Sequence, residues 1–109
     1  MANAIKYIQK GENIDYIPKA AVEYHQIIPF ATRVGVAQAA AEAGETVAVT
    51  LTGVYDMKAD NSVLSVGDEV FFDKVKGVIT STSGSDTVPA GMAVAAKSAG
   101  DDTARIRIG

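Results

Sequence analysis

The chain has 109 residues, of which 48% are hydrophobic and 21% are charged; this fits one globular domain and excludes a disordered chain. It contains no cysteine and a single histidine, His25, which excludes disulfides, thiolate metal sites, a cysteine nucleophile and a multi-histidine metal site within one chain. Ten basic and thirteen acidic residues give a net charge of −3, so no broad basic surface for nucleic acid is expected. Composition therefore argues against an enzyme and against a nucleic-acid binder.

The N-terminal residues differ in charge from the rest of the chain. Residues 1–11 contain Lys6 and Lys10 and no acid, a charge of +2, whereas the remaining eight basic and thirteen acidic residues sum to −5. Spaced apolar residues that end at Gly11 indicate an extended arm that becomes ordered on contact with another molecule. We predict an arm over residues 1–13 and a body over residues 14–109, with an ordinary first strand of the body as the alternative. We expect neither a secretion signal nor a membrane span, because no long apolar run is present.

The first half of the body predicts short strands and one ambiguous segment. Strand candidates lie at residues 14–17, 26–30 and 33–37. Residues 37–43 are strong helix formers followed by Gly44, but seven residues are too few for a stable isolated helix, and we predict a loop or a single turn.

A pattern with a period of two residues, typical of strands, begins after this segment. Residues 46–55 predict one strand with a bulge or bend at Gly53. Residues 68–73 predict a strand with Val70 and Phe72 on one face and Phe71 on the other, and a turn containing Gly77 leads into a returning strand over residues 78–81.

The last part of the chain continues with turns and strands. Residues 83–86 predict a polar loop, residues 89–91 a turn into a strand over 92–97, and residues 99–102 another turn. The final strand, 103–108, alternates Ala104, Ile106 and Ile108 toward the core with Arg105 and Arg107 toward water. Turns every 8–12 residues predict an all-β, small single-domain β-barrel or sandwich with an extended N-terminal arm.

Three residues of the predicted body are candidates for contacts between subunits. Phe71 is expected on the outer face of its strand, where an exposed aromatic residue fits a contact surface; packing under a loop or in a second sheet is the alternative. Arg105 and Arg107 form an ordinary polar face or make salt bridges across a subunit contact.

The search for catalytic and metal-binding groups finds no site. No serine lies in a nucleophile-elbow pattern, so His25 is interpreted as a loop or subunit-contact residue. Asp68 and Glu69 are adjacent on a strand and point to opposite faces, and residues 56–61 lack the calcium-loop spacing. Phosphate-binding loops are absent as well. We therefore predict no catalytic residue, no cofactor and no metal.

The strands and turns carry an ordered set of short motifs. They are Asp15-Tyr16, Val34-Gly35-Val36-Ala37, an Ala-rich stretch to Gly44-Glu45, Val47-Ala48-Val49, Leu51-Thr52-Gly53-Val54-Tyr55, Val66-Gly67-Asp68-Glu69-Val70-Phe71-Phe72-Asp73, Gly77-Val78-Ile79-Thr80, Gly91-Met92-Ala93-Val94-Ala95 and Ala104-Arg105-Ile106-Arg107-Ile108. This set resembles the small capsid cement, or head-decoration, proteins of tailed bacteriophages. The resemblance spans nearly the whole chain and is weakest before Asn13. Phe72 departs from it, since such proteins often carry Trp or Tyr there, and residues 24–30 are less typical.

The resemblance implies a non-enzymatic protein, made in the host cytoplasm, that binds the outer surface of the expanded phage head and clamps neighbouring major capsid proteins. The expected partners are the major capsid protein and further copies of the chain, as a homotrimer or a dimer. Neither nucleic acid nor a membrane is expected as a partner. Capsid contacts are expected from the arm and subunit contacts from the body. The respective candidates are Ile5, Lys6, Tyr7, Ile8 and Lys10, and Phe71, Arg105 and Arg107.

Two other functions remain open from the sequence. One is a minor structural component of the head or tail, which copy number per particle distinguishes from decoration. The other is a small β module that binds sugar or peptide, although the chain has no Trp to form a sugar platform.

Overall fold

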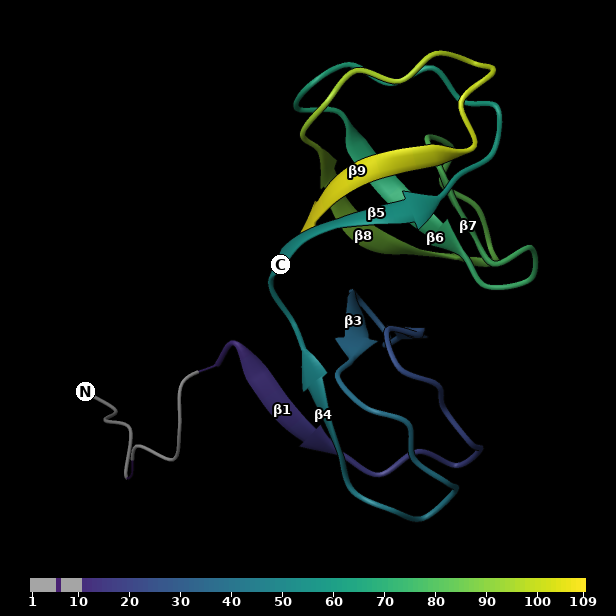
Figure 1. Cartoon of the computed structure of the whole chain (residues 1–109). Helices are drawn as coiled ribbons and strands as arrows, with labels where there is room; N and C mark the ends of the chain where they lie inside the picture. The colour runs from purple at the N-terminus through teal and green to yellow at the C-terminus, as the bar shows by residue number, and fades with distance from the viewer. Residues whose placement is uncertain (1–5, 7–10) are drawn as a thin grey trace.

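The computed structural model describes Lys6 and residues 11–109 and shows an all-β fold of two antiparallel sheets (Figure 1). The strand orders are β1-β4-β3-β2 and β5-β9-β8-β6-β7. The sheets pack as a sandwich-like globule rather than a closed barrel, which confirms the predicted fold class. The strands of the described residues are β1 (Asn13–Tyr16), β2 (Ile27–Pro29), β3 (Val34–Ala37), β4 (Val47–Thr50), β5 (Gly53–Lys58), β6 (Glu69–Asp73), β7 (Val78–Thr80), β8 (Thr87–Ala93) and β9 (Thr103–Ile108).

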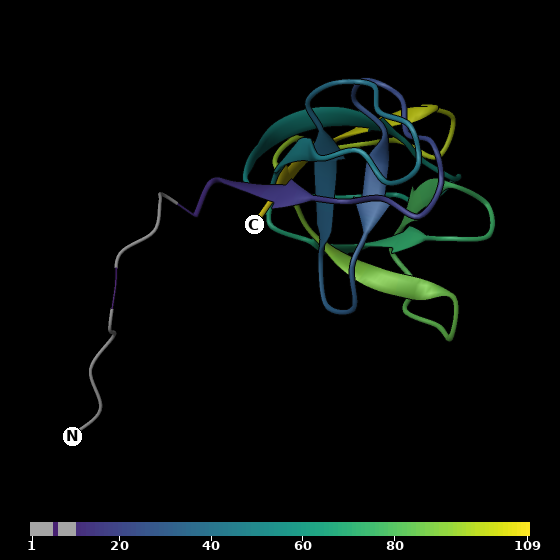
Figure 2. The same cartoon turned by 90° about the horizontal axis from the view of Figure 1, so that it is seen from below.

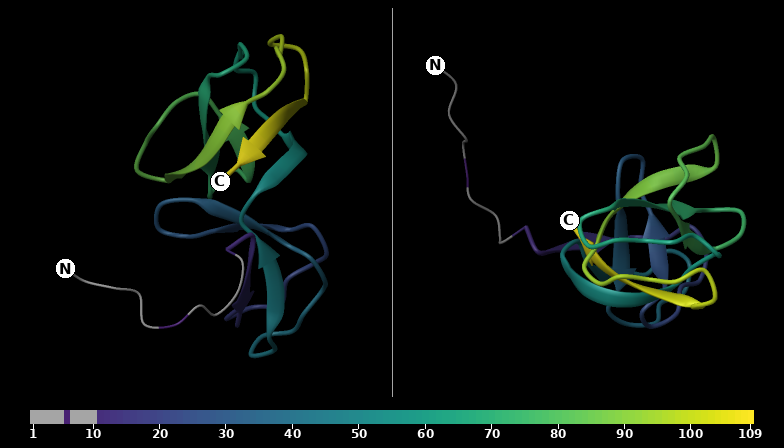
Figure 3. Two further views of the ribbon diagram at one scale, coloured as in Figure 1. Left: turned by 90° about the vertical axis from the view of Figure 1, so that its left-hand side faces the viewer. Right: turned by 90° about the horizontal axis from the view of Figure 1, so that it is seen from above.

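The chain completes one sheet before it begins the other. Strands β1 to β4 form the first sheet, residues 51–52 connect the sheets, and strands β5 to β9 form the second. We call residues 11–52 the N-terminal half and residues 53–109 the C-terminal half. The two halves lie one above the other (Figure 3).

Strand β3 contributes to the cores of both halves, and all of its residues are buried. Val34 and Val36 belong to the large core with the C-terminal sheet, whereas Ala37 belongs to a smaller core within the N-terminal half. Viewed from the side of the N-terminal half, β3 and its neighbours lie directly in front of the C-terminal half (Figure 2). The other buried members of the smaller core are Val22, Ile28, Val47 and Val49.

In the N-terminal half, one arrangement occurs twice: a residue in an isolated β-bridge is followed by a turn, and the turn is followed by a strand. Val22 and Ala41 form an isolated bridge in which each N–H donates to the carbonyl of the other, at 2.8 and 3.0 Å. A four-residue turn follows each of them, over residues 23–26 and 42–45, and leads into β2 and β4. In each turn the last side chain accepts a hydrogen bond from the first N–H. The pairs are Glu23 N to Gln26 Oε1, 2.9 Å, and Glu42 N to Glu45 Oε1, 2.7 Å.

The C-terminal half repeats this arrangement. Leu64 and Lys97 form the equivalent bridge, with N–H to carbonyl distances of 3.0 and 2.9 Å. Turns over residues 65–68 and 98–101 follow and lead into β6 and β9. The turns are closed by Ser65 N donating to Asp68 Oδ2, 2.8 Å, and Ser98 N donating to Asp101 Oδ2, 3.0 Å.

Strand pairing follows the same duplication, so that β1-β4-β3-β2 corresponds to β5-β9-β8-β6. Ala37 pairs with Val49 in one half, and Ala93 pairs with Ile106 in the other. Strand β7 alone has no counterpart among the described strands of the N-terminal half. Corresponding positions are Tyr16 and Met57, Pro18 and Ala59, Lys19 and Asp60, Val22 and Leu64, Ile28 and Val70, Phe30 and Phe72, Ala41 and Lys97, and Leu51 and Ile108.

The prediction of one continuous strand over residues 46–55 is wrong. The chain leaves the first sheet after Thr50 and enters the second at Gly53, whose φ of 127° is open mainly to glycine. The bend was predicted at the right residue, but its consequence is a change of sheet rather than a bulge.

The predicted turn at residues 89–91 and the predicted strand over residues 92–97 are also wrong, because residues 89–91 lie inside β8 and this strand ends at Ala93. Pro89 is tolerated there because β9 pairs only with Gly91, Met92 and Ala93, so that no partner on that side needs the missing N–H. The register shift between β6 and β8 beside Val70 and Phe71 marks an irregularity that explains how a Pro-Ala-Gly segment remains in the sheet.

Most other predictions of local structure are confirmed. Residues 37–43 contain no helix, and the turn before β7 contains Gly77 with a φ of 71°. In β9 the residues Ala104, Ile106 and Ile108 are buried, while Arg105 and Arg107 are exposed.

Candidate interaction surfaces

The predicted arm is described by the structure at one position before Gly11. Lys6 is exposed and belongs to no strand. The candidates Ile5, Tyr7, Ile8 and Lys10 lie outside the described residues. Most of the predicted arm, residues 1–13, lies outside them as well. Their contact with a capsid stays a prediction.

The outer face of the C-terminal sheet brings the other candidates together. Arg105 and Arg107 point outward from β9, and Phe71 lies on the same face of β6, with β8 between them. Phe71 is half-buried beside its partners Thr80 and Pro89 and belongs to neither core. The predicted outer face of Phe71 is correct, but its side chain is half-buried rather than exposed, and its role in a subunit contact stays a prediction.

A row of four residues crosses this outer face. Val54 lies opposite Arg107, Arg107 opposite Met92, and Met92 opposite Glu69, and directly opposed residues share one face of a sheet. Val54 is 54% exposed and Met92 is 37% exposed. The row therefore offers apolar and charged groups side by side. The sequence analysis missed Val54 and Met92 because it placed both in strands with the wrong bounds.

An ion pair borders the row. Arg105 Nε donates to Asp56 Oδ1 at 3.0 Å, and Arg105 Nη2 donates to Asp56 Oδ2 at 3.3 Å. The hydrogen bond from Arg105 lowers the pKa of Asp56 below its ordinary value. Both side chains are more than half exposed, so the pair orients charges on the surface and adds little to stability.

Lys97 is a buried cation that the sequence analysis did not single out. It is 4% exposed, and its Nζ donates to Ser62 O at 2.7 Å and to Ser98 O at 3.1 Å. These hydrogen bonds connect two loops of the C-terminal half. The equivalent residue of the N-terminal half is Ala41, which has no side-chain donor. Burial raises the pKa of Asp60 nearby, but hydrogen bonds from Ser62 and Thr80 and the charge of Lys97 outweigh it and hold that pKa below its ordinary value.

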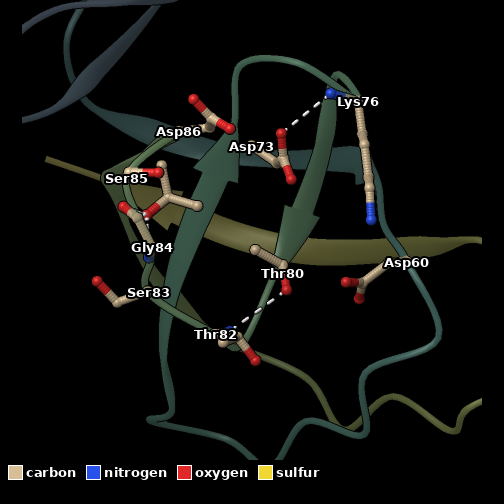
Figure 4. A pocket seen from close by; sticks show the side chains of 10 residues that line it. Asp60, Asp73, Lys76, Thr80, Thr82, Ser83, Gly84, Ser85 and Asp86 are labelled. Atoms are coloured by element: carbon tan, nitrogen blue, oxygen red, sulfur yellow. Dashed lines mark hydrogen bonds between the residues drawn. The ribbon is translucent and has the colours of Figure 1, made fainter.

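A polar pocket opens between the β6–β7 turn and the loop before β8 (Figure 4). Asp73 Oδ1 accepts hydrogen bonds from the backbone of Val75 and Lys76, at 2.9 and 3.0 Å, and thereby stabilises the turn. Asp60 and Asp86 also line the pocket, but no three ligating side chains gather there or elsewhere in the described part of the chain. The carboxylates of Asp60 and Asp73 act as acceptors, Asp60 from Ser62 in its loop and Asp73 in its turn.

No helix among the described residues is long and apolar enough to cross a membrane.

A family model described as phage cement protein matches residues 8–108. The chain belongs to the phage cement protein family. No curated protein and no solved structure matched it. This family consists of structural capsid proteins, so the cement protein described here is a capsid component of a phage virion and not an enzyme.

Proposed function

We propose that this cement protein binds the outer surface of the expanded head and clamps neighbouring major capsid proteins. The observation that carries the proposal is the family match over residues 8–108. A ligand that binds only the expanded shell stabilises that shell by linkage, and a clamp that spans several subunits gains from effective concentration.

Sedimentation with undecorated expanded heads of its own phage tests the proposal. The protein should co-sediment at micromolar concentration and saturate at hundreds of copies per head. Saturation at a few copies would instead indicate a minor head or tail component, and absence from the pellet would reject binding to the head altogether.

The arm is proposed as one attachment to the capsid. Its apolar residues can add an extended strand to a sheet edge, and Lys6 and Lys10 favour an acidic surface. Deleting residues 1–11 retains Glu12, whose carbonyl accepts the Leu51 N–H at 2.7 Å. We expect the melting temperature to stay unchanged and head binding to weaken by about tenfold or more, because one of several linked contacts is lost. Equal binding of the truncated and full-length proteins would contradict this role.

The outer face of the C-terminal sheet is proposed as the contact between copies in a homotrimer, with a dimer as the alternative. Phe71→Ser removes the half-buried aromatic ring of this face. We expect weaker self-association in sedimentation velocity and a loss of subunit stability below about 1 kcal/mol, which corresponds to about 5 °C or less. Val75→Ser, on an exposed turn, is the control. A larger loss of stability with unchanged association would show that Phe71 serves the fold alone.

A further inference from the structure

The N-terminal half lacks the strand that closes the C-terminal half. Strand β7 pairs with β6 on one side. On its other side Ile79 forms a parallel bridge with Ala59, and its carbonyl accepts the Asp60 N–H at 3.0 Å. The equivalent place in the N-terminal half lies between β2 and residues 18–19, and no described strand occupies it.

A groove of about 280 Å³ lies at that place, lined by Tyr16, residues 18–22 and residues 26–29. The corresponding residues of the C-terminal half, among them Met57, Leu64 and Val70, form one core with Ile79, which is fully buried. The groove therefore occupies the position in the N-terminal half that corresponds to the position of the Ile79 side chain in the C-terminal half.

Incomplete burial of the smaller core agrees with a missing strand. In the C-terminal half, Met57 is 4% exposed, Phe72 is 7% exposed and Ile108 is fully buried. Their counterparts in the N-terminal half are all only half-buried, although Tyr16 and Phe30 contact each other edge to face, with ring centroids 5.3 Å apart. The counterparts are Tyr16, Phe30 and Leu51. Of the three, Tyr16 lines the groove, so an aliphatic side chain added there would cover part of this apolar surface.

We propose that the groove receives an extended segment of the major capsid protein, with an aliphatic side chain in the place that Ile79 takes in the other half. This inference rests on the proposed function and adds a second contact to the arm. Addition of a strand to an open edge supplies backbone hydrogen bonds, and a pocket for one side chain supplies specificity.

The charge at the groove selects the kind of segment. In the C-terminal half the residue after Ile79 is Thr80, whose hydroxyl hydrogen-bonds to Asp60. Lys19 stands at the position of Asp60 and is exposed, with no ion pair to any described residue. An aspartate or glutamate directly after the aliphatic residue therefore fits this groove best.

The same charge argues against the arm of a neighbouring copy as the occupant. In the arm Ile5 is followed by Lys6, and Lys10 comes after Ile8 without any acid. Docking of the arm would therefore place the cation Lys6 or the neutral Gln9 beside Lys19, and neither supplies the ion pair that an acidic residue would form. On the other side of the groove lies Pro29 of β2, which has no N–H to donate. The edge of β2 is therefore less able to pair with extended segments at random.

Two variants and two matched controls test the groove by sedimentation with undecorated expanded heads. Ala21→Phe fills the groove and should weaken binding about tenfold or more, whereas Lys19→Glu reverses the charge and should weaken it about threefold to tenfold, more at low salt. The controls are Val63→Phe, at the position equivalent to Ala21, and Lys76→Glu on the β6–β7 turn. We expect both controls to bind as the unmodified protein does and all four variants to keep its melting temperature.

The outcomes separate the inference from the function on which it rests. If the unmodified protein binds heads and both Ala21→Phe and Lys19→Glu bind equally well, the groove is not a capsid contact. If the unmodified protein does not bind heads, the proposed function itself fails.

Cross-linking identifies the occupant directly. A photo-reactive amino acid at position 21 should cross-link to the major capsid protein on purified decorated heads, and mass spectrometry should place the link in an aliphatic segment beside an acidic residue. A link to residues 1–10 of a neighbouring copy, or no link while the protein is bound, would overturn the assignment.

Discussion

Replacing Gly91 with alanine should destabilise the protein by about 3–5 kcal/mol, a large part of the total stability of a domain of this size. Gly91 has a φ of 145°, a backbone conformation that residues with a side chain rarely adopt. A Cβ at this position would overlap with the carbonyl oxygen of Arg107 in the neighbouring strand. Because this neighbour is backbone, β8 and β9 would have to separate at the centre of the C-terminal sheet.

Gly100→Ala is the matched control for this prediction. A Cβ at Gly100 would meet nothing within 4 Å, and its φ lies outside the left-handed region. Urea unfolding should therefore show a large loss of stability for Gly91→Ala and almost none for Gly100→Ala. Similar midpoints for the two variants would contradict the close approach of β8 and β9.

Ile79→Ala should cost about 2–5 kcal/mol, because truncation of a fully buried side chain removes contacts and leaves a cavity. Ile79 contributes to the large core from the one strand that the N-terminal half lacks. The variant would give the C-terminal half the same gap that the groove forms in the N-terminal half.

Thermal unfolding of Ile79→Ala and Val75→Ala checks this prediction. Val75 is 74% exposed and lies in the turn before β7, so its truncation should be nearly neutral. A loss below about 1 kcal/mol for Ile79→Ala would show that β7 does not complete the core and would remove the basis for the groove proposal.

Alternation of apolar and polar residues was sufficient to predict β6 and β9 in the C-terminal half. The pattern of β9 is strict because one of its faces is buried and the other is exposed. The same rule placed Phe71 on the outer face and Phe72 in the core. Strand β3 was placed correctly although all of its residues are buried.

Alternation failed where one apolar run serves two sheets or where glycine and proline lie inside a strand. Branched apolar residues alternate with small or polar residues over 46–52, and nothing local distinguishes a bend within a strand at Gly53 from a passage between two sheets. Pro89 and Gly91 are typical of turns, and only the limited extent of pairing between β8 and β9 makes them compatible with a strand.

The duplication could have been found in the sequence. Residues 35–44 and 91–100 are identical at six of ten positions. These matches are all glycine and alanine, and the repeat was not recognised because residues 37–43 were interpreted as a loop or single turn and residues 92–97 as a strand. The groove depends on this duplication, since it is recognised only by comparison with β7, and sequence periodicity alone could not reveal it.

The central claim is that this cement protein stabilises the expanded shell by binding it, and heating of filled expanded heads tests the claim most directly. With the protein present at 100 times its dissociation constant, linkage predicts about 2.7 kcal/mol of stabilisation per site. The temperature at which heads release their DNA should therefore rise with protein concentration and level off once every site is filled. A release temperature that stays the same at saturating protein would contradict the account.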